Sequence, residues 1–234
     1  MGHTIKPLRP VITPILTRED VSALEGLSLD NVILCLYDKN KKIAQESGPI
    51  IFTANGLSGP AALNISRSVD LTGSAAFRLE IDSQPADSPE TLMEILQSLL
   101  MGNNKLLRNS LEGLMPLRYA ESLIASSGLD ADRVANSLNR SEREKLARSI
   151  KSQILSVRSL EGYNRAMVTA GGVDLKEVDP STMRSKLIDN LFLAGEILDL
   201  AGPTGGYNLQ LAWSTGYAAG MAVAEGNAPI KRTK

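Results

Sequence analysis

The segment that most constrains the fold lies near the end of the chain, where an apolar run meets a glycine-rich turn. Residues 191–194 are typical of a strand, and Gly195-Glu196 follow directly. A loop with three glycines then leads through residues 202–208 into a helix of small residues, expected over 207–224. Glycines let backbone N–H groups approach a ligand closely, and a helix N-terminus adds unpaired donors and a positive dipole end. The pattern predicts a platform for a polar, partly anionic, planar cofactor.

Five residues of this segment are candidate cofactor ligands beside Gly195. The carboxylate of Glu196 is suited to accept hydrogen bonds from sugar-like hydroxyls. Gly205 and Gly206 would let backbone N–H groups stabilise negative charge on a reduced ring. Tyr207 either stacks on that ring or only begins the helix, whereas Asn208 is expected to cap the helix more than to touch a ligand. The simpler alternative for Gly195-Glu196 is a strand that ends in an exposed turn.

The closing helix has a face of small residues. Ala212, Gly216, Gly220 and Ala224 recur every four positions, so this face is expected to pack closely against a sheet. Two interior glycines cost about 1 kcal/mol each relative to alanine, and close packing would offset that cost. Trp213 in the same helix is expected to be a packing residue. Polar side chains in the helix argue against a membrane span.

Composition narrows the class of protein. The chain has 234 residues, 43% of them hydrophobic and 22% charged, which fits one large or two small globular domains. A net charge of −1 gives no reason to expect nucleic acid or a membrane as a partner. The single cysteine, Cys35, is expected in the core and excludes an internal disulfide, and the single histidine, His3, argues against a metal site. Few cysteines and no signal-peptide pattern favour the cytoplasm.

The remaining sequence predicts an α+β fold. Apolar alternation predicts strands over residues 31–37 and 76–82, with a further strand over 42–52, and together these suggest a small barrel or sandwich. The middle third predicts helices, one capped by Ser88 and another by a capping box that starts at Ser141. A domain boundary is expected between residues 153 and 162.

Two further loops are candidates for binding. Thr53 to Pro60 is expected to be a tight loop. Thr53 and Ser58 are candidates to line a substrate pocket, although the residues alone favour a plain loop–helix connection. Gly171 and Gly172 end an apolar strand and would bring backbone against a ring, or simply make a tight turn. No catalytic residue is predicted, because a lone His3 cannot complete a Ser/His/Asp arrangement.

The combined motifs resemble a bacterial family of FAD-binding, NAD(P)/FAD-dependent oxidoreductases, often labelled aminoacetone oxidase-like, whose relatives include reductases of unsaturated 3-oxo bile acids. The resemblance covers nearly the whole chain in the right order. Its blocks are Gly195-Glu196-Ile197-Leu198-Asp199, Gly205-Gly206-Tyr207-Asn208-Leu209-Gln210, Val168-Thr169-Ala170-Gly171-Gly172-Val173, Pro10-Val11-Ile12-Thr13-Pro14 and Gly56-Leu57-Ser58-Gly59-Pro60.

The resemblance implies a domain plan and a cofactor. Residues 1–155 would be an inserted, substrate-side domain, strand-rich over 1–85 and helical over 86–155, and residues 156–234 would complete an FAD-binding domain with C-terminal strands and a helix. Family members begin with a Rossmann half that carries Gly-x-Gly-x-x-Gly, and this sequence has none. Weak or no FAD binding is therefore expected of this chain alone, which looks like an incomplete portion of the enzyme.

The implied activity is hydride transfer between FAD and a small or steroid-like substrate, linked to NAD(P)H. Two other possibilities stay open. The chain is either a non-catalytic substrate-binding or assembly module whose flavin-binding half is a separate partner chain, or a small-molecule binder that merely retains the scaffold.

Overall fold

The computed structural model describes residues 2–71 and 76–226, and it divides into two compact units. One unit, the barrel unit, contains residues 14–160, and the other, the terminal unit, contains residues 1–13 with 161–234. The first 13 residues group with the end of the chain, and the break at 160/161 lies within the range of residues 153–162 where a boundary is expected.

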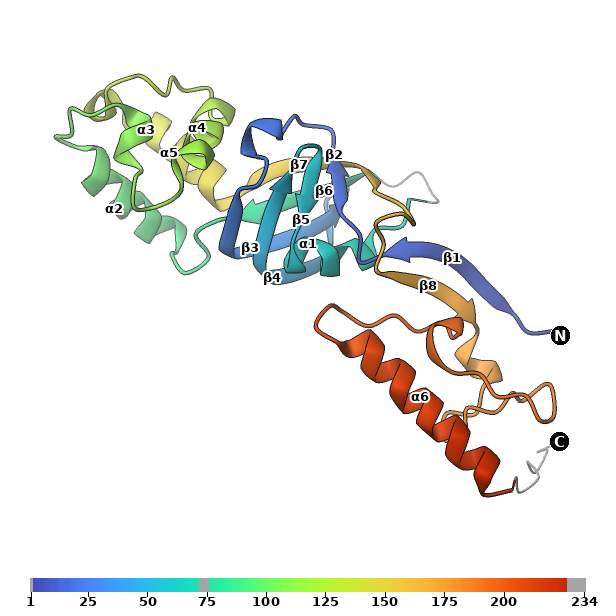
Figure 1. Cartoon of the computed structure of the whole chain (residues 1–234). Coiled ribbons are helices and arrows are strands. Elements are labelled where there is room, and N and C mark those ends of the chain that lie inside the picture. The colour runs from blue at the N-terminus through green and yellow to red at the C-terminus, as the bar shows by residue number, and fades with distance from the viewer. Residues whose placement is uncertain (1, 72–75, 227–234) are drawn as a thin grey trace. The chain divides into compact units, whose positions relative to one another are not determined.

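The barrel unit is built on a closed six-stranded barrel with the strand order β2-β5-β4-β3-β6-β7, all neighbours antiparallel (Figure 1). Its strands are β2 (Ile15–Thr17), β3 (Ser28–Asp38), β4 (Lys41–Thr53), β5 (Gly56–Ser58), β6 (Phe77–Asp82) and β7 (Gln153–Leu160). Closure leaves no strand edge unpaired, so the barrel does not depend on another strand for its hydrogen bonds.

Alternation in the sequence explains which side of each strand is buried. In β6, Phe77, Leu79 and Ile81 are buried while the residues between them are partly exposed. In β3, Leu34 and Leu36 are fully buried, as the apolar pattern predicts. Cys35 points to the opposite face and is only half-buried, so its expected place in the core is wrong.

The segment after Thr53 is not the loop that the sequence predicts. Residues 56–58 form strand β5, which pairs with both β2 and β4. A Cβ at Gly56 would lie 2.0 Å from the carbonyl oxygen of Ile15, so glycine lets β2 approach this closely. The expected helix follows as α1 (Pro60–Ile65), after Gly59 with φ of 87°.

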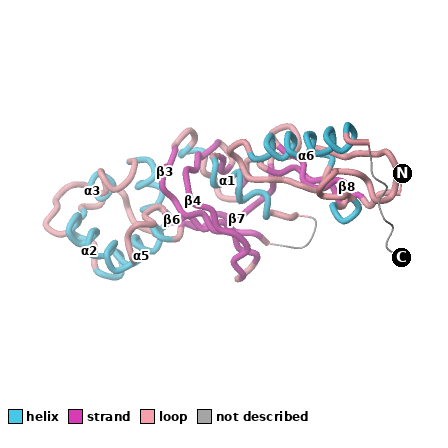
Figure 2. Tube along the Cα trace, turned by 90° about the horizontal axis from the view of Figure 1, so that it is seen from below, coloured by secondary structure: helices cyan, strands magenta, loops and turns pink. Residues whose placement is uncertain are grey.

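Helices complete the barrel unit, and Figure 2 shows α2, α3 and α5 grouped beside the barrel strands. Ser88 caps the first of them by accepting a hydrogen bond from the Thr91 N–H at 3.1 Å, as predicted. The helices are α2 (Pro89–Leu100), α3 (Leu107–Ser110), α4 (Leu117–Ser126) and α5 (Arg140–Lys151), with 3₁₀ turns at Ser22–Leu24, Ser66–Ser68 and Ala135–Ser137.

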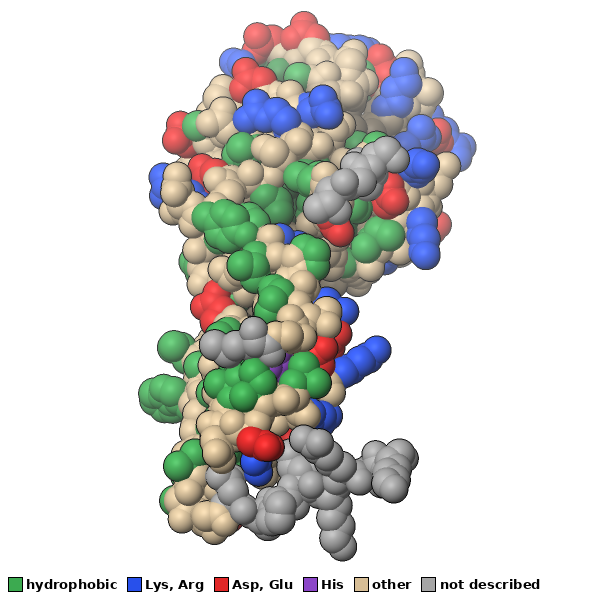
Figure 3. Space-filling view, turned by 90° about the vertical axis from the view of Figure 1, so that its right-hand side faces the viewer, with side chains coloured by type: hydrophobic (Ala, Val, Ile, Leu, Met, Phe, Trp, Pro, Cys, Tyr) green, Lys and Arg blue, Asp and Glu red, His purple; other side chains and the backbone are tan. Residues whose placement is uncertain are grey.

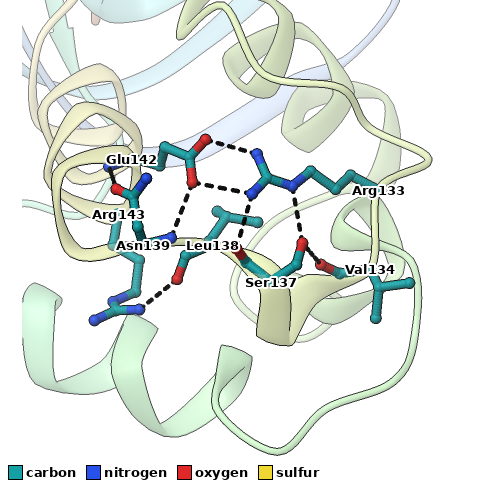
Figure 4. Close-up of polar contacts among 7 residues, drawn as sticks. All are labelled: Arg133, Val134, Ser137, Leu138, Asn139, Glu142 and Arg143. Carbon is teal, nitrogen blue, oxygen red and sulfur yellow. Dashed lines mark hydrogen bonds and ion pairs between the residues drawn. The ribbon is translucent and has the colours of Figure 1, made fainter.

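The cap of α5 lies two residues before the predicted position. Asn139 accepts from the Glu142 N–H at 3.0 Å, and the Glu142 carboxylate accepts from the Asn139 N–H at 2.9 Å. Arg133 also donates to Glu142 at 2.6 Å and to the Ser137 hydroxyl at 2.8 Å (Figure 4). Asparagine is as good a cap as serine, and here Arg133 holds the loop that places Asn139 at the N-cap, directly before α5.

One hydrophobic core serves both the barrel and its helices. The Phe52 ring of β4 lies 5.9 Å from the Tyr119 ring of α4, and both residues are fully buried. The Tyr119 hydroxyl donates to the Gln153 side chain of β7 at 3.0 Å, so its polar group is satisfied inside the core. The strand-rich and helical parts are therefore one folding unit.

The terminal unit is smaller and less regular. Strand β1 (Ile5–Val11) pairs antiparallel with β8 (Val168–Val173), and α6 (Tyr207–Ala224) begins and ends as predicted. Short 3₁₀ turns lie at Leu175–Glu177 and Gly195–Ile197. None of the described helices is both long and apolar enough to cross a membrane.

Two predicted features of this unit are wrong. Residues 191–194 form no strand, because their backbone hydrogen bonds are isolated and do not make a continuous ladder. The Ser185 N–H donates to the Leu191 carbonyl, and the Leu193 N–H donates to the Met183 carbonyl. Strand β8 does not break at its double glycine but continues to Val173.

Candidate functional site

A pocket of about 390 Å³ lies in the terminal unit, at the N-terminus of α6. Among the residues that line it, Glu196 carries the single ionisable side chain, and most of the others are apolar or glycine. The predicted residues that line it are Gly195, Glu196, Gly205, Gly206 and Asn208. Five of the eight residues that the sequence assigned to a cofactor thus meet at one cavity.

Glycines shape the entry to α6. Gly206 is the residue before the helix, with φ of 90°, and Gly205 has φ of 101°. No heavy atom lies within 4 Å of a Cβ placed on Gly206. Gly206, the N-cap residue, has no side chain that could accept a hydrogen bond from the N–H groups of the first turn. This wall of the pocket therefore offers donors and the positive end of an 18-residue helix.

The turn that carries Glu196 is fixed from two sides. One carboxylate oxygen of Glu196 accepts a hydrogen bond from the Thr169 N–H of β8, which leaves its other oxygen for a ligand. The Gly195 N–H donates to the Thr215 hydroxyl at 2.9 Å, and that hydroxyl donates in turn to the Leu211 carbonyl at 2.7 Å. Thr215 is the buried residue of α6, so the carboxylate is held between a strand and a helix.

Asn208 does not cap the helix. Its side-chain oxygen accepts from the Gly202 N–H at 2.8 Å, and its amide nitrogen donates to the carbonyls of Gly202 and Pro203, each at 3.1 Å. Asn208 therefore holds the preceding loop against α6 while it also lines the pocket.

Three predicted cofactor residues lie outside the pocket lining. Tyr207 is 59% exposed and is not among the residues that line the cavity, although its ring lies 3.8 Å from a Cβ placed on Gly205, which does line it. A Cβ on Gly171 would lie 2.2 Å from the Pro7 carbonyl oxygen, and one on Gly172 would lie 2.4 Å from the Ile197 carbonyl oxygen. These two glycines let neighbouring backbone pack against β8, which explains them without a ligand.

Thr53 and Ser58 belong to the barrel unit, where Thr53 ends β4 and Ser58 ends β5. Neither lines the pocket at α6. Their role in a substrate pocket stays a prediction.

No sequence pattern marks the apolar walls of the pocket or the role of Thr215. Ile12, Met167 and Leu200 line the cavity although they are far apart in the chain. Ile12 has φ of 52°, a conformation uncommon for a branched residue, but no sequence signal marks it. The sequence marks Thr215 only as one of several polar residues of the helix, and the structure shows its hydrogen bonds to the Gly195 N–H and to the carbonyls of Leu211 and Ala212.

The small-residue face of α6 does not pack as predicted. Among the described residues, and leaving aside the backbone of α6 itself, no heavy atom lies within 4 Å of a Cβ placed on Gly216 or Gly220. Trp213, expected to be packed, is 74% exposed, and Leu209 and Tyr217 are exposed to a similar extent. Figure 3 shows hydrophobic side chains at the surface of the molecule.

A model of the HI0933-like protein barrel and H2TH domain matches residues 9–168. The chain belongs to the HI0933-like family. The match includes all six barrel strands and the four helices beside them, and it ends before Gly195. Family membership therefore accounts for the barrel unit, while the pocket at α6 is argued from its own geometry.

Curated relatives extend the similarity over nearly the whole chain. A 3-dehydro-bile acid delta(4,6)-reductase of Clostridium scindens is 32% identical, covering 96% of this chain and 56% of the relative. Ribosomal RNA dihydrouridine synthases of Haemophilus influenzae and Escherichia coli are 33% and 29% identical, covering 95% and 93% of this chain. The chain spans about half the length of these relatives, 53% and 52% for the two synthases. None of the three names supports the aminoacetone oxidase label.

Proposed function

We propose that the pocket at the N-terminus of α6 binds the flavin of a flavin-dependent oxidoreductase, FAD in the complete enzyme. The observation that carries the proposal is that Glu196 and the uncapped start of α6 line the same cavity. A carboxylate suits the hydroxyls of a ribityl chain, and unpaired helix N–H groups suit the negative charge of a reduced ring.

The remaining lining agrees with this cofactor. Apolar side chains such as Ile12, Met167 and Leu211 offer a surface for a planar ring, and Gly205 and Gly206 leave room for it beside the backbone. A volume of about 390 Å³ is in the range of small-molecule pockets. The chain's task would be to orient the ring and to hold Glu196 in place through Thr169 and Thr215.

A bound flavin would supply hydride transfer, and we propose a small or steroid-like organic substrate with NAD(P)H as the linked cofactor. The name of the Clostridium scindens relative, a bile acid reductase, supports a reduction of this kind. Because the chain covers about half of that relative, the substrate and the linkage are proposals for the whole protein.

The test compares two flavins that differ in one group. Riboflavin has a ribityl chain and lumiflavin has none, and binding of each is followed by flavin fluorescence. We expect weak binding of both to this chain, with dissociation constants of about 0.1–1 mM. Glu196→Gln should weaken riboflavin about fivefold and leave lumiflavin unchanged, because the carboxylate serves only the hydroxyls.

The matched control is Glu225→Gln, at the other end of α6 and outside the pocket. It should change neither flavin. If Glu196→Gln leaves riboflavin binding unaffected, or weakens lumiflavin binding to the same extent, the proposed site is wrong.

A second candidate is a non-catalytic module that works with a separate flavin-binding partner chain. The exposed apolar row of α6, Leu209, Trp213 and Tyr217, favours a partner at this helix, because such residues recur every four positions on one face. Mixing the chain with the unmatched part of the Clostridium scindens relative tests it. A stable complex that fails to reduce flavin would favour the module, and a complex that turns over would favour the enzyme.

A further inference from the structure

A cavity of about 370 Å³ lies in the barrel unit, beside α4, the end of α5 and the start of β7. Four serines line it: Ser122 and Ser126 of α4, Ser149 of α5, and Ser152 directly after α5. Ser122 and Ser126 are about one helical turn apart, so they lie on the same face of α4. We call this site the serine cavity, and its lining residues are mainly polar, unlike those of the pocket at α6.

Gln153, the first residue of β7, brings a buried donor to the serine cavity. The residue is 7% exposed, and its side-chain oxygen accepts the hydrogen bond of the Tyr119 hydroxyl at 3.0 Å. Among the described residues, none accepts a hydrogen bond from the Gln153 amide nitrogen, and this nitrogen is not fully enclosed by protein. It therefore faces the cavity that Gln153 lines. An N–H group buried without an acceptor costs free energy, so an occupant with an acceptor atom would be stabilised here.

The serine hydroxyls have hydrogen-bonding capacity to spare. In the described part of the chain, the Ser122 and Ser152 side chains make no hydrogen bond. The Ser149 and Ser127 hydroxyls share a hydrogen bond of 2.9 Å, which leaves the Ser149 oxygen with a free lone pair. Because a hydroxyl can both donate and accept, these groups fit a ligand that does the same.

Two carboxylates, those of Glu19 and Asp20, give the serine cavity its charge. Glu19 is held in place, because its carboxylate accepts from the Ser156 N–H at 2.7 Å and from the Ser156 hydroxyl at 2.8 Å. One oxygen of Asp20 accepts from the Ser22 N–H at 2.9 Å, which leaves the other oxygen for a ligand. No lysine, arginine or histidine is among the described residues of the lining, so an anionic ligand would meet repulsion and no cation.

These groups favour a ligand hydroxyl over a ligand amine. A hydroxyl can donate to Asp20 and also accept from the Gln153 N–H, whereas an ammonium group can only donate. The described residues of the lining include no aromatic side chain, so a flat ring would find no stacking surface. The volume of about 370 Å³ is in the range of small-molecule sites. The lining therefore suits several hydroxyls on a small, uncharged, non-aromatic framework.

We propose that the serine cavity binds a small uncharged polyol, a monosaccharide or a cyclitol, through its hydroxyl groups. The cavity belongs to the barrel unit and shares no lining residue with the pocket at α6, so the proposal does not depend on the proposed flavin site.

The test follows backbone and side-chain amide signals of the ¹⁵N-labelled full chain by NMR as glucose, myo-inositol, glucose 6-phosphate or cyclohexanol is added. We expect the Ser122 and Ser152 amides and the Gln153 side-chain amide to shift in a saturable way with glucose or myo-inositol, at millimolar concentrations. Glucose 6-phosphate should bind at least about fivefold more weakly, because its negative charge meets Glu19 and Asp20. Cyclohexanol, whose ring carries a single hydroxyl, should cause no saturable shift.

Two variants and a matched control sharpen the result. Ser122→Ala should weaken polyol binding about fivefold, because one hydroxyl is lost, and Ser126→Trp should abolish it by filling the cavity. Ser141→Ala removes an exposed serine of α5 outside the cavity and should bind as the wild type does. The proposal is overturned if neither glucose nor myo-inositol causes saturable shifts up to about 20 mM. It is equally overturned if glucose 6-phosphate or cyclohexanol binds as tightly, or if Ser122→Ala and Ser141→Ala behave alike.

Discussion

The barrel unit and the terminal unit differ in how they bury their apolar residues. In the barrel unit, one continuous core runs from the strands to the helices and includes Leu34, Phe52 and Tyr119. In the terminal unit, one smaller cluster contains Val173, Val178, Met183, Leu193 and Leu198, with four partly buried neighbours. The barrel is also closed, whereas β1 and β8 form a sheet of two strands. Two-stranded sheets are marginally stable alone, so the terminal unit has more to gain from a ligand or partner.

The largest expected effect is a difference in stability between two leucine-to-alanine variants, one in each unit. Leu34→Ala, in the fully buried centre of β3, should lower the free energy of unfolding by about 3 kcal/mol. Leu209→Ala, at a 69% exposed position of α6, should change the stability of the chain by less than about 0.5 kcal/mol. Urea unfolding of both variants measures the difference. Equal losses would mean that α6 is covered in solution.

A pH experiment isolates the barrel core. Burial raises the pKa of Tyr119, so the folded chain keeps this proton at a pH where the unfolded chain loses it. Stability should therefore fall as the pH rises above 10, with a contribution of about 1.4 kcal/mol per pH unit from this residue. Tyr119→Phe should remove that part of the slope. An unchanged slope in the variant would show that the hydroxyl is not buried.

The start of α5 allows the observed cap, Asn139, to be compared with the predicted cap, Ser141. Asn139→Ala should cost about 1 kcal/mol, whereas Ser141→Ala should stay within about 0.5 kcal/mol. Thermal unfolding of the two variants compares the observed cap with the position that the sequence favours. A larger loss for the serine variant would restore the predicted start of the helix.

The smallest effect concerns the terminal unit. Thr215→Val removes the hydroxyl that holds the Gly195 N–H, at a cost of about 0.5–1 kcal/mol, whereas Thr215→Ser keeps the hydroxyl. Hydrogen exchange at the Gly195 amide should accelerate in the valine variant and stay slow in the serine variant. Similar exchange in both variants would remove Thr215 from the description of the site.

These two units also differ in how far their sequences predict them. Alternation at Phe77, Leu79 and Ile81 and the cap at Ser88 are local signals, and the structure confirms both. Strand β5 could not be predicted, because three residues are too few to show an alternating pattern. Its position depends on pairing with β2, which is distant in the sequence. Residues 191–194 have strand-like composition, yet without a continuous ladder they stay irregular.

The same distinction holds for the candidate site. Glycine and acidic residues near α6 predict a cavity, and Gly195, Glu196, Gly205 and Gly206 do line one. Gly171 and Gly172 look alike in sequence but serve backbone packing, which only the approach of Pro7 and Ile197 reveals. The walls from Ile12 and Met167 come from two different strand ends, so no local pattern could assign them.

The most direct measurement is an NMR titration of the full chain with riboflavin, read at the backbone amides. Our account predicts saturable shifts at Gly195, Gly205 and Gly206. Saturable shifts confined to the barrel unit would contradict it.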